Sequence, residues 1–410
     1  MTTAPLPCLV CGGPDVRMFL DLGHTALANK FLLPSELDAP EPRYPLRVGF
    51  CPTCTHVQLT DRVPPTDMFS DYLYVSAASQ TLQDHFVDLS NVLVDRHRLG
   101  ADDLVVDIGC NDASLLDAFR SHGVRTLGVD PAENLAERAA NLGIDRFTGF
   151  FGAGTALEIR DRWGVASLIT ATNTFPHIPD LADFMAGIET LLSPTGTFTV
   201  EAHYLVDILD QVAFDTVYHE HVSYWALGPL VRLVEDTDLE VVRAERLPIH
   251  HGQLRVTIQR RGQGTVDSSV AAVLAEEERL GLGELSTFER FASGAHRIKS
   301  DLQKLLRELN ADGNQVAAYG APAKGSTLLE FLQLGPDDIA WIADRSALKQ
   351  GRFTPGSHIP VVGTELMLSE QPDYVVLLAW NFADEVVAQQ SEYLANGGRF
   401  ILPVPEVRVL

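Results

Sequence analysis

The stretch Leu104–Leu116, LVVDIGCNDASLL, decides the fold of this 410-residue chain. A short apolar run ends in the acid Asp107, a turn around Gly109 follows, and a helical pattern begins near Ser114. Glycine permits the tight turn, and the N–H groups at the start of the next helix can face a polar ligand. The stretch is therefore typical of a strand, turn and helix at the ligand-binding edge of a parallel sheet.

The glycine turn does not fit a nicotinamide dinucleotide, because the fingerprint for that cofactor has three glycines and only Gly109 is present. The turn instead resembles the first motif of the class I methyltransferases, which bind S-adenosylmethionine. A second apolar run ends in an acid that could accept from both ribose hydroxyls. The alternative at this stage is a doubly wound domain with another cofactor or with none. The residues assigned to the cofactor are Asp107, Gly109, Asn111, Asp112, Asp130 and Asn173.

The composition excludes several classes of protein. A hydrophobic content of 46% and a charged content of 21% are ordinary for a soluble globular chain of two or three domains. No apolar run approaches the roughly 20 residues that span a bilayer, and the first residues do not form a leader, so a cytoplasmic protein is predicted. A net charge of −24 repels phosphates, which argues against a nucleic-acid or membrane binder. Oligomeric state is left open.

Four of the five cysteines form two CxxC pairs in a proline-rich segment with little periodicity. Four thiolates can close tetrahedrally on zinc, and a small loop-rich segment gains much of its fold from such a metal. A pair of redox CxxC motifs is the alternative, but no βαβ pattern surrounds either pair. Cys110 is interpreted as a small turn residue. The predicted ligands of a structural zinc are Cys8, Cys11, Cys51 and Cys54.

The predicted fold class is α/β, with a central doubly wound sheet, an N-terminal zinc-binding domain and a C-terminal Rossmann-like domain. The predicted boundaries are 1–70 for the zinc domain, 71–260 for the methyltransferase-like domain, 261–310 for a helical connector and 311–410 for the Rossmann-like domain. Strands are expected at 104–108, 126–129, 166–170 and 197–200, with helices near 114–121, 134–141 and 181–192. Two or three strands are expected within 228–260, and a helical run over 263–309.

Three further stretches carry polar groups at positions suited to chemistry. The loop Asn173–His177 follows a predicted strand, where ligands lie in such sheets. The block Tyr218–Trp225, YHEHVSYW, gathers proton-transfer groups, with an ordinary polar cluster as the alternative. Its consecutive His-Glu-His side chains do not converge easily on one metal. The turn Gly320–Thr327, GAPAKGST, lacks the spacing of a nucleotide-hydrolysing loop, so it either holds a phosphate of a nucleotide-linked substrate or is a tight turn.

In their order along the chain, these motifs resemble the sugar C-methyltransferases of deoxysugar biosynthesis. The resemblance extends from the first CxxC pair to Asp344 and Lys349-Gln-Gly351, and its most specific parts are YHEHVSYW and YGAPAKGST. It implies a zinc domain, an S-adenosylmethionine domain and a C-terminal domain that holds a nucleotide-linked keto-sugar. The residues that it places around the sugar are Tyr72 (or Tyr74), His177, Tyr218, Glu220 and His221, and those assigned to substrate binding are Tyr74, Lys324, Ser326, Asp344 and Lys349.

The expected reaction is methyl transfer to a carbon beside a ketone, at C3 of a thymidine-diphosphate 4-keto-6-deoxysugar, through an enolate. His221 is the expected base because imidazole titrates near neutral pH, and Glu220 is the second candidate. His177 and a tyrosine are expected to donate to the carbonyl oxygen. One alternative is a bifunctional enzyme that also reduces the ketone with NADPH, and another is a non-catalytic zinc-ribbon interaction protein.

Overall fold

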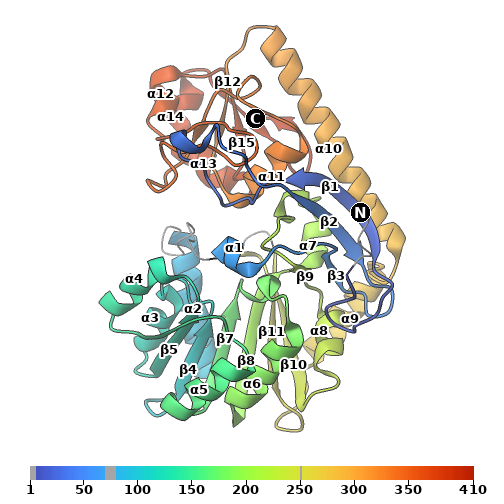
Figure 1. Cartoon of the computed structure of the whole chain (residues 1–410), viewed down its shortest axis with the longest axis vertical. Helices are drawn as coiled ribbons and strands as arrows, with labels where there is room; N and C mark the ends of the chain where they lie inside the picture. The colour runs from blue at the N-terminus through green and yellow to red at the C-terminus, as the bar shows by residue number, and fades with distance from the viewer. Residues whose placement is uncertain (1–5, 70–79, 250–251) are drawn as a thin grey trace.

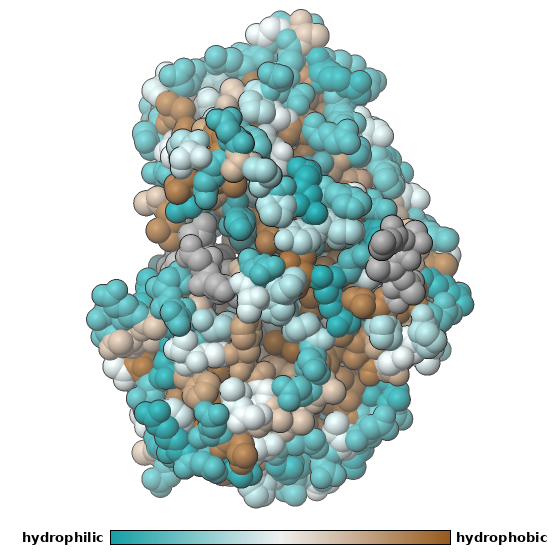
Figure 2. All heavy atoms as spheres, in the orientation of Figure 1, coloured by the Kyte–Doolittle hydropathy of each residue, from teal (hydrophilic) through white to brown (hydrophobic). Residues whose placement is uncertain are grey.

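The computed structural model describes residues 6–69, 80–249 and 252–410. Figure 1 shows two lobes, with the long helix α10 (Leu285–Ala311) running along one side of the molecule from the lower lobe to the upper one. In Figure 2, the left edge of the molecule is indented between the two lobes. Tyr72 and Tyr74 lie outside the described residues, so their assigned roles stay predictions.

The lower lobe contains a seven-stranded sheet in the order β10-β11-β8-β7-β4-β5-β6, as expected for a doubly wound domain. The strands from β4 to β8 are parallel, and β11 and β10 add an antiparallel edge. All five residues of β4 are buried, because helices cover both faces of the sheet. The strands are β4 (Leu104–Ile108), β5 (Arg125–Asp130), β6 (Asp145–Thr148), β7 (Ala166–Thr172), β8 (Leu192–His203), β10 (Leu239–Leu247) and β11 (Gln253–Arg260).

The helices of this lobe follow the predicted alternation with its strands. Helices near 114–121, 134–141 and 181–192 were expected, and the structure forms α3, α4 and α6 there. The helices are α2 (Gln80–His97), α3 (Ser114–Arg120), α4 (Ala136–Asn141), α5 (Ala153–Trp163), α6 (Leu181–Leu191) and α7 (Leu205–Asp210). The 3-10 turns of the same lobe are η3 (Glu133–Leu135), η4 (Phe175–His177) and η5 (Phe214–Thr216).

The prediction for residues 228–260 was partly wrong, because the segment begins with the helix α8 (Leu227–Val234) before its two strands. Leu227, Leu230 and Val234 are buried, which is the three- and four-residue spacing of one helix face. The helical run expected over 263–309 is divided into α9 (Ser268–Arg279) and α10. Gly281 interrupts it with φ of +73°, a conformation that a side chain would oppose.

The N-terminal sheet is completed by a strand from the lower lobe. Its order is β1 (Arg17–Thr25), β2 (Tyr44–Phe50), β3 (Val57–Leu59) and β9 (Ser223–Tyr224). Val57 pairs with Tyr224, and the N–H of Leu59 donates to the carbonyl of Val222 at 3.0 Å. The zinc domain is therefore joined by backbone hydrogen bonds to the end of the YHEHVSYW block. The helix α1 (Pro65–Phe69) follows β3.

The upper lobe is the expected second α/β unit, with a six-stranded sheet in the order β14-β13-β12-β15-β16-β17. All its strand pairs are parallel except β16 with β17. The strands are β12 (Val316–Tyr319), β13 (Ile342–Ala343), β14 (Val361–Val362), β15 (Tyr374–Leu377), β16 (Arg399–Leu402) and β17 (Arg408–Val409). The helices are α11 (Ala323–Phe331), α12 (Leu366–Glu370), η7 (Trp380–Phe382), α13 (Ala383–Gln389) and α14 (Ser391–Ala395).

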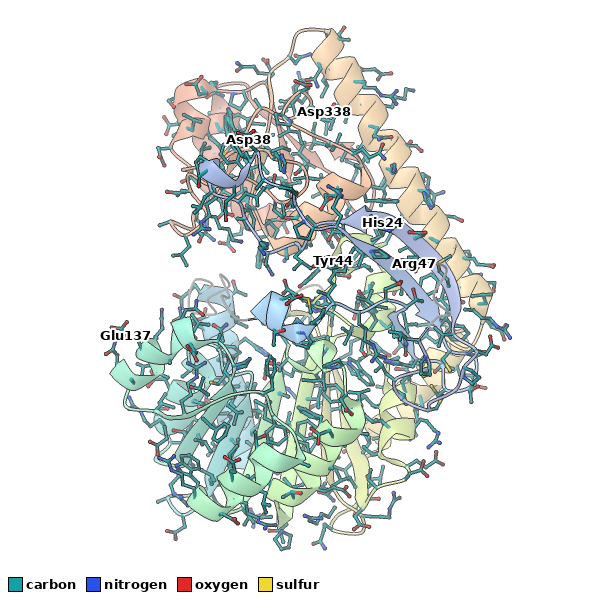
Figure 3. All side chains as sticks on the ribbon, viewed as in Figure 1. His24, Asp38, Tyr44, Arg47, Glu137 and Asp338 are labelled. Carbon is teal, nitrogen blue, oxygen red and sulfur yellow. The ribbon has the colours of Figure 1, made fainter. Side chains whose placement is uncertain are left out.

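The N-terminal chain between β1 and β2, which includes η1 (Pro34–Glu36), reaches across to the upper lobe, where Asp38 lies in Figure 3. Leu32 and Phe353 exchange two backbone hydrogen bonds of 2.9 Å. Arg43 forms an ion pair with Glu330 of α11. The N-terminal domain thus contacts both lobes. In the described parts of the chain, none of the helices combines the length and the apolar character needed to cross a membrane.

Candidate active site

One large cavity, of about 1140 Å³, lies between the carboxyl ends of the two parallel sheets and is lined by both lobes. This is where ligands bind in open α/β sheets. Most of the predicted site residues meet there, although they are spread over 240 positions of the sequence. The predicted residues that line the cavity are Gly109, Asn111, Asp130, Asn173, His177, Tyr218, His221, Lys324, Asp344 and Lys349.

The glycine turn after β4 is held by the carboxylate of Asp130. The N–H of Asn111 donates to one oxygen at 2.9 Å, and the N–H of Ala132 donates to the other at 2.8 Å. Gly109 has φ of +75°, and a Cβ there would lie 2.0 Å from the Thr174 hydroxyl oxygen. Glycine is therefore required, both by the backbone conformation and by the close approach of Thr174. Asp130 and the turn face the cavity together, as a ribose-bearing cofactor needs.

Asp107 and Asp112, which were assigned to the cofactor, bond within the protein beside this turn. Asp107 accepts from the Thr170 hydroxyl at 2.7 Å, and burial raises its pKa to about 7. Asp112 accepts from the Ser114 hydroxyl at 2.6 Å and is fully buried. Neither residue lines the cavity. Their carboxylates fix the strand end and the start of α3, and their roles toward the cofactor remain predictions.

The turn after β12 in the upper lobe repeats the arrangement of the turn after β4. Asp344 accepts from the N–H of Ala321 at 2.6 Å with one oxygen and from the N–H of Ser346 at 2.7 Å with the other. Gly320 has φ of +83°, and a Cβ there would lie 2.6 Å from Cβ of Ala379. The cavity is thus bounded by two equivalent turns, one in each lobe, and each turn has an acid at the end of the neighbouring strand.

Tyr218 and His221 form a hydrogen-bonded pair in the cavity wall. The Tyr218 hydroxyl lies 2.8 Å from Nε2 of His221, and Nδ1 of His221 lies 2.8 Å from the carbonyl oxygen of Thr216. A carbonyl oxygen only accepts, so Nδ1 carries the proton of the neutral ring and Nε2 accepts from Tyr218. Burial lowers the pKa of His221 well below its usual value, and the nearby rings of His177 and His203 lower it further. The imidazole is therefore neutral near pH 7.

Glu220 and His177 are linked through the backbone. Nδ1 of His177 donates to the carbonyl oxygen of Glu220 at 2.7 Å, and burial lowers the pKa of His177 to about 4. The rings of His177 and His221 lie 5.0 Å apart between centroids. The carboxylate of Glu220 is buried and accepts from Asn29, which belongs to the N-terminal domain. Two histidines and a tyrosine therefore line one end of the cavity, whereas the predicted site residue Glu220 does not line it and is reached through Asn29 and the His177 ring.

Lys324 enters the cavity from the upper lobe and meets the lower lobe at Asp215. Its ammonium lies 4.2 Å from the centroid of the Trp380 ring, and the Trp380 indole N–H donates to Asp215 at 2.6 Å. Burial lowers the pKa of Lys324 to about 8, and Asp215 opposes that shift. Lys349 donates to the carbonyl of Ala321 at 2.7 Å. These two amines are suited to a phosphate that enters from the upper lobe.

The hydroxyl of Ser326, the remaining residue assigned to substrate binding, is buried in α11 and does not line the cavity. Ser326 lies two positions after Lys324 on the same helix. The cavity is also lined by many residues for which the sequence analysis assigned no role, because they belong to no motif with a recognisable spacing. Four of them matter for the site, and they come from all three domains. They are Asn29, His203, Thr216 and Trp380.

The four cysteines of the two CxxC pairs converge as predicted. Their sulfur atoms all lie within 4.8 Å of one another, with 3.4 Å between Cys8 and Cys54 and 3.6 Å between Cys11 and Cys51. The sulfur atoms of a tetrahedral zinc site with bonds of about 2.3 Å lie about 3.8 Å apart. The hydrogen bond with Cys54 lowers the pKa of the Cys8 thiol, which favours the thiolate form that binds zinc. The four-sulfur set fits a closed structural zinc site.

Comparison with known proteins places this geometry in a family. Models of a zinc binding domain, a methyltransferase domain and a C-methyltransferase C-terminal domain match residues 8–69, 84–244 and 248–405. C-methyltransferase NovU from Streptomyces niveus is 39% identical over 404 residues, which are 98% of this chain and 96% of that protein. The chain belongs to the C-methyltransferase family. As a C-methyltransferase it is an enzyme that uses S-adenosylmethionine, and the zinc domain is part of the family architecture.

Two solved structures resemble less than half of this C-methyltransferase. Magnesium protoporphyrin IX methyltransferase (ChlM) from Synechocystis PCC 6803 is 13% identical with a TM-score of 0.35, covering 43% of this chain and 83% of that one. The PH0226 protein from Pyrococcus horikoshii OT3 is 12% identical with a TM-score of 0.37, covering 49% of this chain and 100% of that one.

Proposed function

We propose that this C-methyltransferase methylates C3 of a thymidine-diphosphate 4-keto-6-deoxysugar through an enolate, as part of deoxysugar biosynthesis. The observation that carries the proposal is the shared cavity, in which the turns at Asp130 and Asp344 face one space beside Tyr218 and His221. One turn suits the ribose of the methyl donor, and the other suits the sugar ring of a nucleoside. A substrate that has both a nucleotide and an enolisable carbon would occupy the remaining volume.

Carbon methylation requires a carbon nucleophile, and a C–H bond beside a ketone is acidic enough to supply one. S-adenosylmethionine supplies an electrophilic methyl group when it is bound. The protein has to remove the proton from C3, stabilise the negative charge on the ketone oxygen, and keep water away from both. Buried donors placed at the developing oxyanion are an effective way to lower such a barrier.

His221 is the proposed base, as its neutral imidazole already accepts a hydrogen bond at Nε2 from Tyr218. The proton from C3 would reach the ring through the phenol, which gives its own proton to Nε2 as it takes the one from carbon. The expected role of His177 as donor to the ketone oxygen does not fit its tautomer, because the one N–H of the neutral ring, on Nδ1, already donates to the Glu220 carbonyl. Tyr72 is therefore the proposed donor to the ketone oxygen, and the lone pair on Nε2 of His177 is suited to accept from a hydroxyl of the sugar. Glu220 is the alternative base, and in the main proposal it orients the neighbouring groups.

Lys324 and Lys349 are the proposed contacts to the diphosphate. Their local positive charge would hold this anion in a protein whose net charge is −24. The acid Asp344 would accept from a hydroxyl of the nucleoside sugar, as its counterpart Asp130 would from the cofactor.

The decisive experiment incubates purified enzyme, S-adenosylmethionine and the keto-sugar nucleotide, and follows the sugar by mass spectrometry. A gain of one methyl group, with solvent deuterium entering at C3 when the methyl donor is omitted, is the expected result. Hydride uptake with added NADPH and loss of the carbonyl would support the bifunctional alternative. An unchanged sugar and an unconsumed methyl donor would overturn the proposal.

The base assignment has its own test in the variant His221→Asn. The asparagine keeps a hydrogen-bonding side chain but cannot take up a proton, so turnover should fall on the order of 10²-fold or more. Binding of S-adenosylhomocysteine, measured by calorimetry, should be unchanged. Turnover near that of the wild type would remove His221 from this role.

A further inference from the structure

Asn29 of the N-terminal domain lies at the junction of all three domains. It lines the cavity, and its side-chain amide donates to both carboxylate oxygens of Glu220, at 2.8 and 2.9 Å. An ionised carboxylate only accepts, so the amide must present its NH2 group to Glu220. Glu220 is 3% exposed, and a buried carboxylate depends on such donors for its charge to be tolerated.

The segment around Asn29 is held by the upper lobe. The N–H of Ala26 donates to Glu330 at 2.8 Å, and Leu32 forms its two backbone hydrogen bonds with Phe353. Two residues beyond Asn29, the ring of Phe31 lies 4.9 Å from the ammonium of Lys349. The upper lobe therefore fixes the position of Asn29, whereas the side chain of Asn29 donates its hydrogen bonds to Glu220 of the lower lobe.

The hydrogen bonds of Glu220 connect Asn29 to His177 in the active site. The peptide carbonyl of Glu220 accepts from Nδ1 of His177, which fixes the proton of that ring on Nδ1 and sets the direction of the ring. The side chain that Asn29 holds and the carbonyl that orients His177 belong to the same residue, so a displacement of Glu220 would also reorient the His177 ring. Glu220 also adjoins His221, the proposed base.

We propose that Asn29 is a positioning residue, through which the zinc-bearing domain and the upper lobe hold Glu220 and His177 in the geometry for methyl transfer. The inference rests on the proposed function for its catalytic readout. It makes the N-terminal domain a contributor to the active site, in addition to its role as a zinc-stabilised support. Asn29 touches neither reacting atom in this account and acts only through Glu220.

The test is a double-substitution cycle on turnover. Asn29→Asp places two carboxylates together, so kcat should fall about 100-fold while the KM for the keto-sugar nucleotide changes less than about 3-fold. With Glu220→Gln already present, the amide and the carboxylate are exchanged, and adding Asn29→Asp should cost less than about 3-fold in kcat. Equal losses in both backgrounds, or an unchanged kcat in Asn29→Asp, would overturn the inference.

A matched control separates positioning from loss of a domain contact. Glu41, also in the N-terminal domain, accepts from the N–H of Gly356 at 3.0 Å and lies 3.1 Å from His358, outside the cavity. Glu41→Gln should lower the melting temperature and leave kcat within about 2-fold. A loss of kcat in Glu41→Gln as large as in Asn29→Asp would show that any weakened domain contact suffices, against the inference.

A second readout does not depend on activity. The free energy of unfolding, measured by denaturant titration of the zinc-loaded protein, should show the same cycle, since Asn29→Asp destabilises only where Glu220 is a carboxylate. A wild-type enzyme that methylates no keto-sugar nucleotide would overturn the proposed function. The unfolding measurements would still test whether Asn29 stabilises the Glu220 carboxylate. Equal destabilisation by Asn29→Asp in the wild type and in Glu220→Gln would refute that interaction.

Discussion

His221 accepts a hydrogen bond of 2.8 Å from the Tyr218 hydroxyl while its other nitrogen donates to the Thr216 carbonyl at the same distance. The carbonyl fixes the tautomer, so the lone pair of the ring points at the phenol. A proton taken up at the phenol oxygen can therefore be matched by one passed to the imidazole. In the proposed mechanism the two side chains together take up one proton from the substrate, and the first prediction tests this arrangement.

Tyr218→Phe should lower kcat about 100-fold or more, because the imidazole loses the hydroxyl through which it reaches the substrate proton. Binding of S-adenosylhomocysteine should be unchanged in calorimetry. Tyr224→Phe is the matched control, since it also removes a buried hydroxyl and its ring lies 6.5 Å from that of His221. Wild-type kcat in Tyr218→Phe, or equal losses in the two variants, would contradict the proposed relay.

The pH dependence of activity should show no acid limb near pH 6.5. Burial lowers the pKa of His177 to about 4 and that of His221 well below its usual value. Both rings then stay neutral well below pH 6.5, so kcat should not fall between pH 8 and pH 6. A sigmoidal loss of kcat centred near pH 6.5, measured by initial rates, would show that these imidazoles are solvated.

The same buried histidines should make the folded protein less stable as the pH is lowered. Histidine in the unfolded chain has a pKa of about 6.5, whereas His177 has one of about 4 when folded. Below about pH 6.5 the unfolded chain binds protons that the folded chain does not, so acidification lowers stability down to about pH 4. The midpoint of urea unfolding should fall over that range, and less steeply in His177→Asn. Identical slopes in both proteins would contradict the buried, neutral state of His177.

Much of the site was predictable because its residues stand at strand ends or in dense motifs. Gly109, Asp130 and Asp344 follow apolar runs, and Tyr218–His221 is a cluster within four residues. Asn29 has no such signal. Its contact with Glu220 spans 191 positions and exists because an irregular segment is held against the upper lobe. Local patterns contain no information about such a contact.

The helix α8 shows a second limit of local patterns. Its sequence contains two valines, which strands favour, and a glycine and a proline, which weaken a helical pattern, yet the spacing places Leu227, Leu230 and Val234 on one buried helix face. The N–H groups of Leu227 and Gly228 donate to Glu277 of α9, which caps the helix from 50 and 49 positions away. A cap supplied by tertiary contact is not visible in the sequence of the helix itself.

Loss of zinc should disturb the active site as well as the N-terminal domain. Cys51 is fully buried in the four-sulfur cluster and follows β2, while β3 pairs with β9 next to the Tyr218–His221 segment. Cys51→Ser should lower the zinc content, measured by atomic emission, together with the melting temperature and kcat. Cys110→Ala, outside the cluster, should keep its zinc. Full activity in a zinc-free Cys51→Ser enzyme would contradict this coupling.

The two equivalent turns predict that the same change, aspartate to asparagine, weakens a different ligand in each lobe. In either acid, exchange of a carboxylate oxygen for an NH2 group places it against a backbone N–H and breaks one of the turn's hydrogen bonds. Asp130→Asn should lower the affinity for S-adenosylhomocysteine about 10-fold and leave the affinity for thymidine diphosphate unchanged. Asp344→Asn should lower the affinity for thymidine diphosphate and leave that for S-adenosylhomocysteine unchanged. Each variant is the control for the other. Calorimetry in which both variants weaken the same ligand would contradict the assignment of one turn to each ligand.

Lys324 should make nucleotide affinity depend on pH in the alkaline range. Its pKa is lowered by burial to about 8, so an increasing share of the amine is neutral above that pH. A neutral amine attracts a diphosphate weakly, so the dissociation constant of thymidine diphosphate should rise between pH 8 and pH 9.5. Lys324→Met should bind about 10-fold more weakly at pH 7 and lose this pH dependence. Because Asp215 lies close to the amine, Asp215→Asn should move the midpoint of the transition to lower pH. A wild-type affinity that does not change over this range, with Lys324→Met equally tight, would place the diphosphate elsewhere in the cavity.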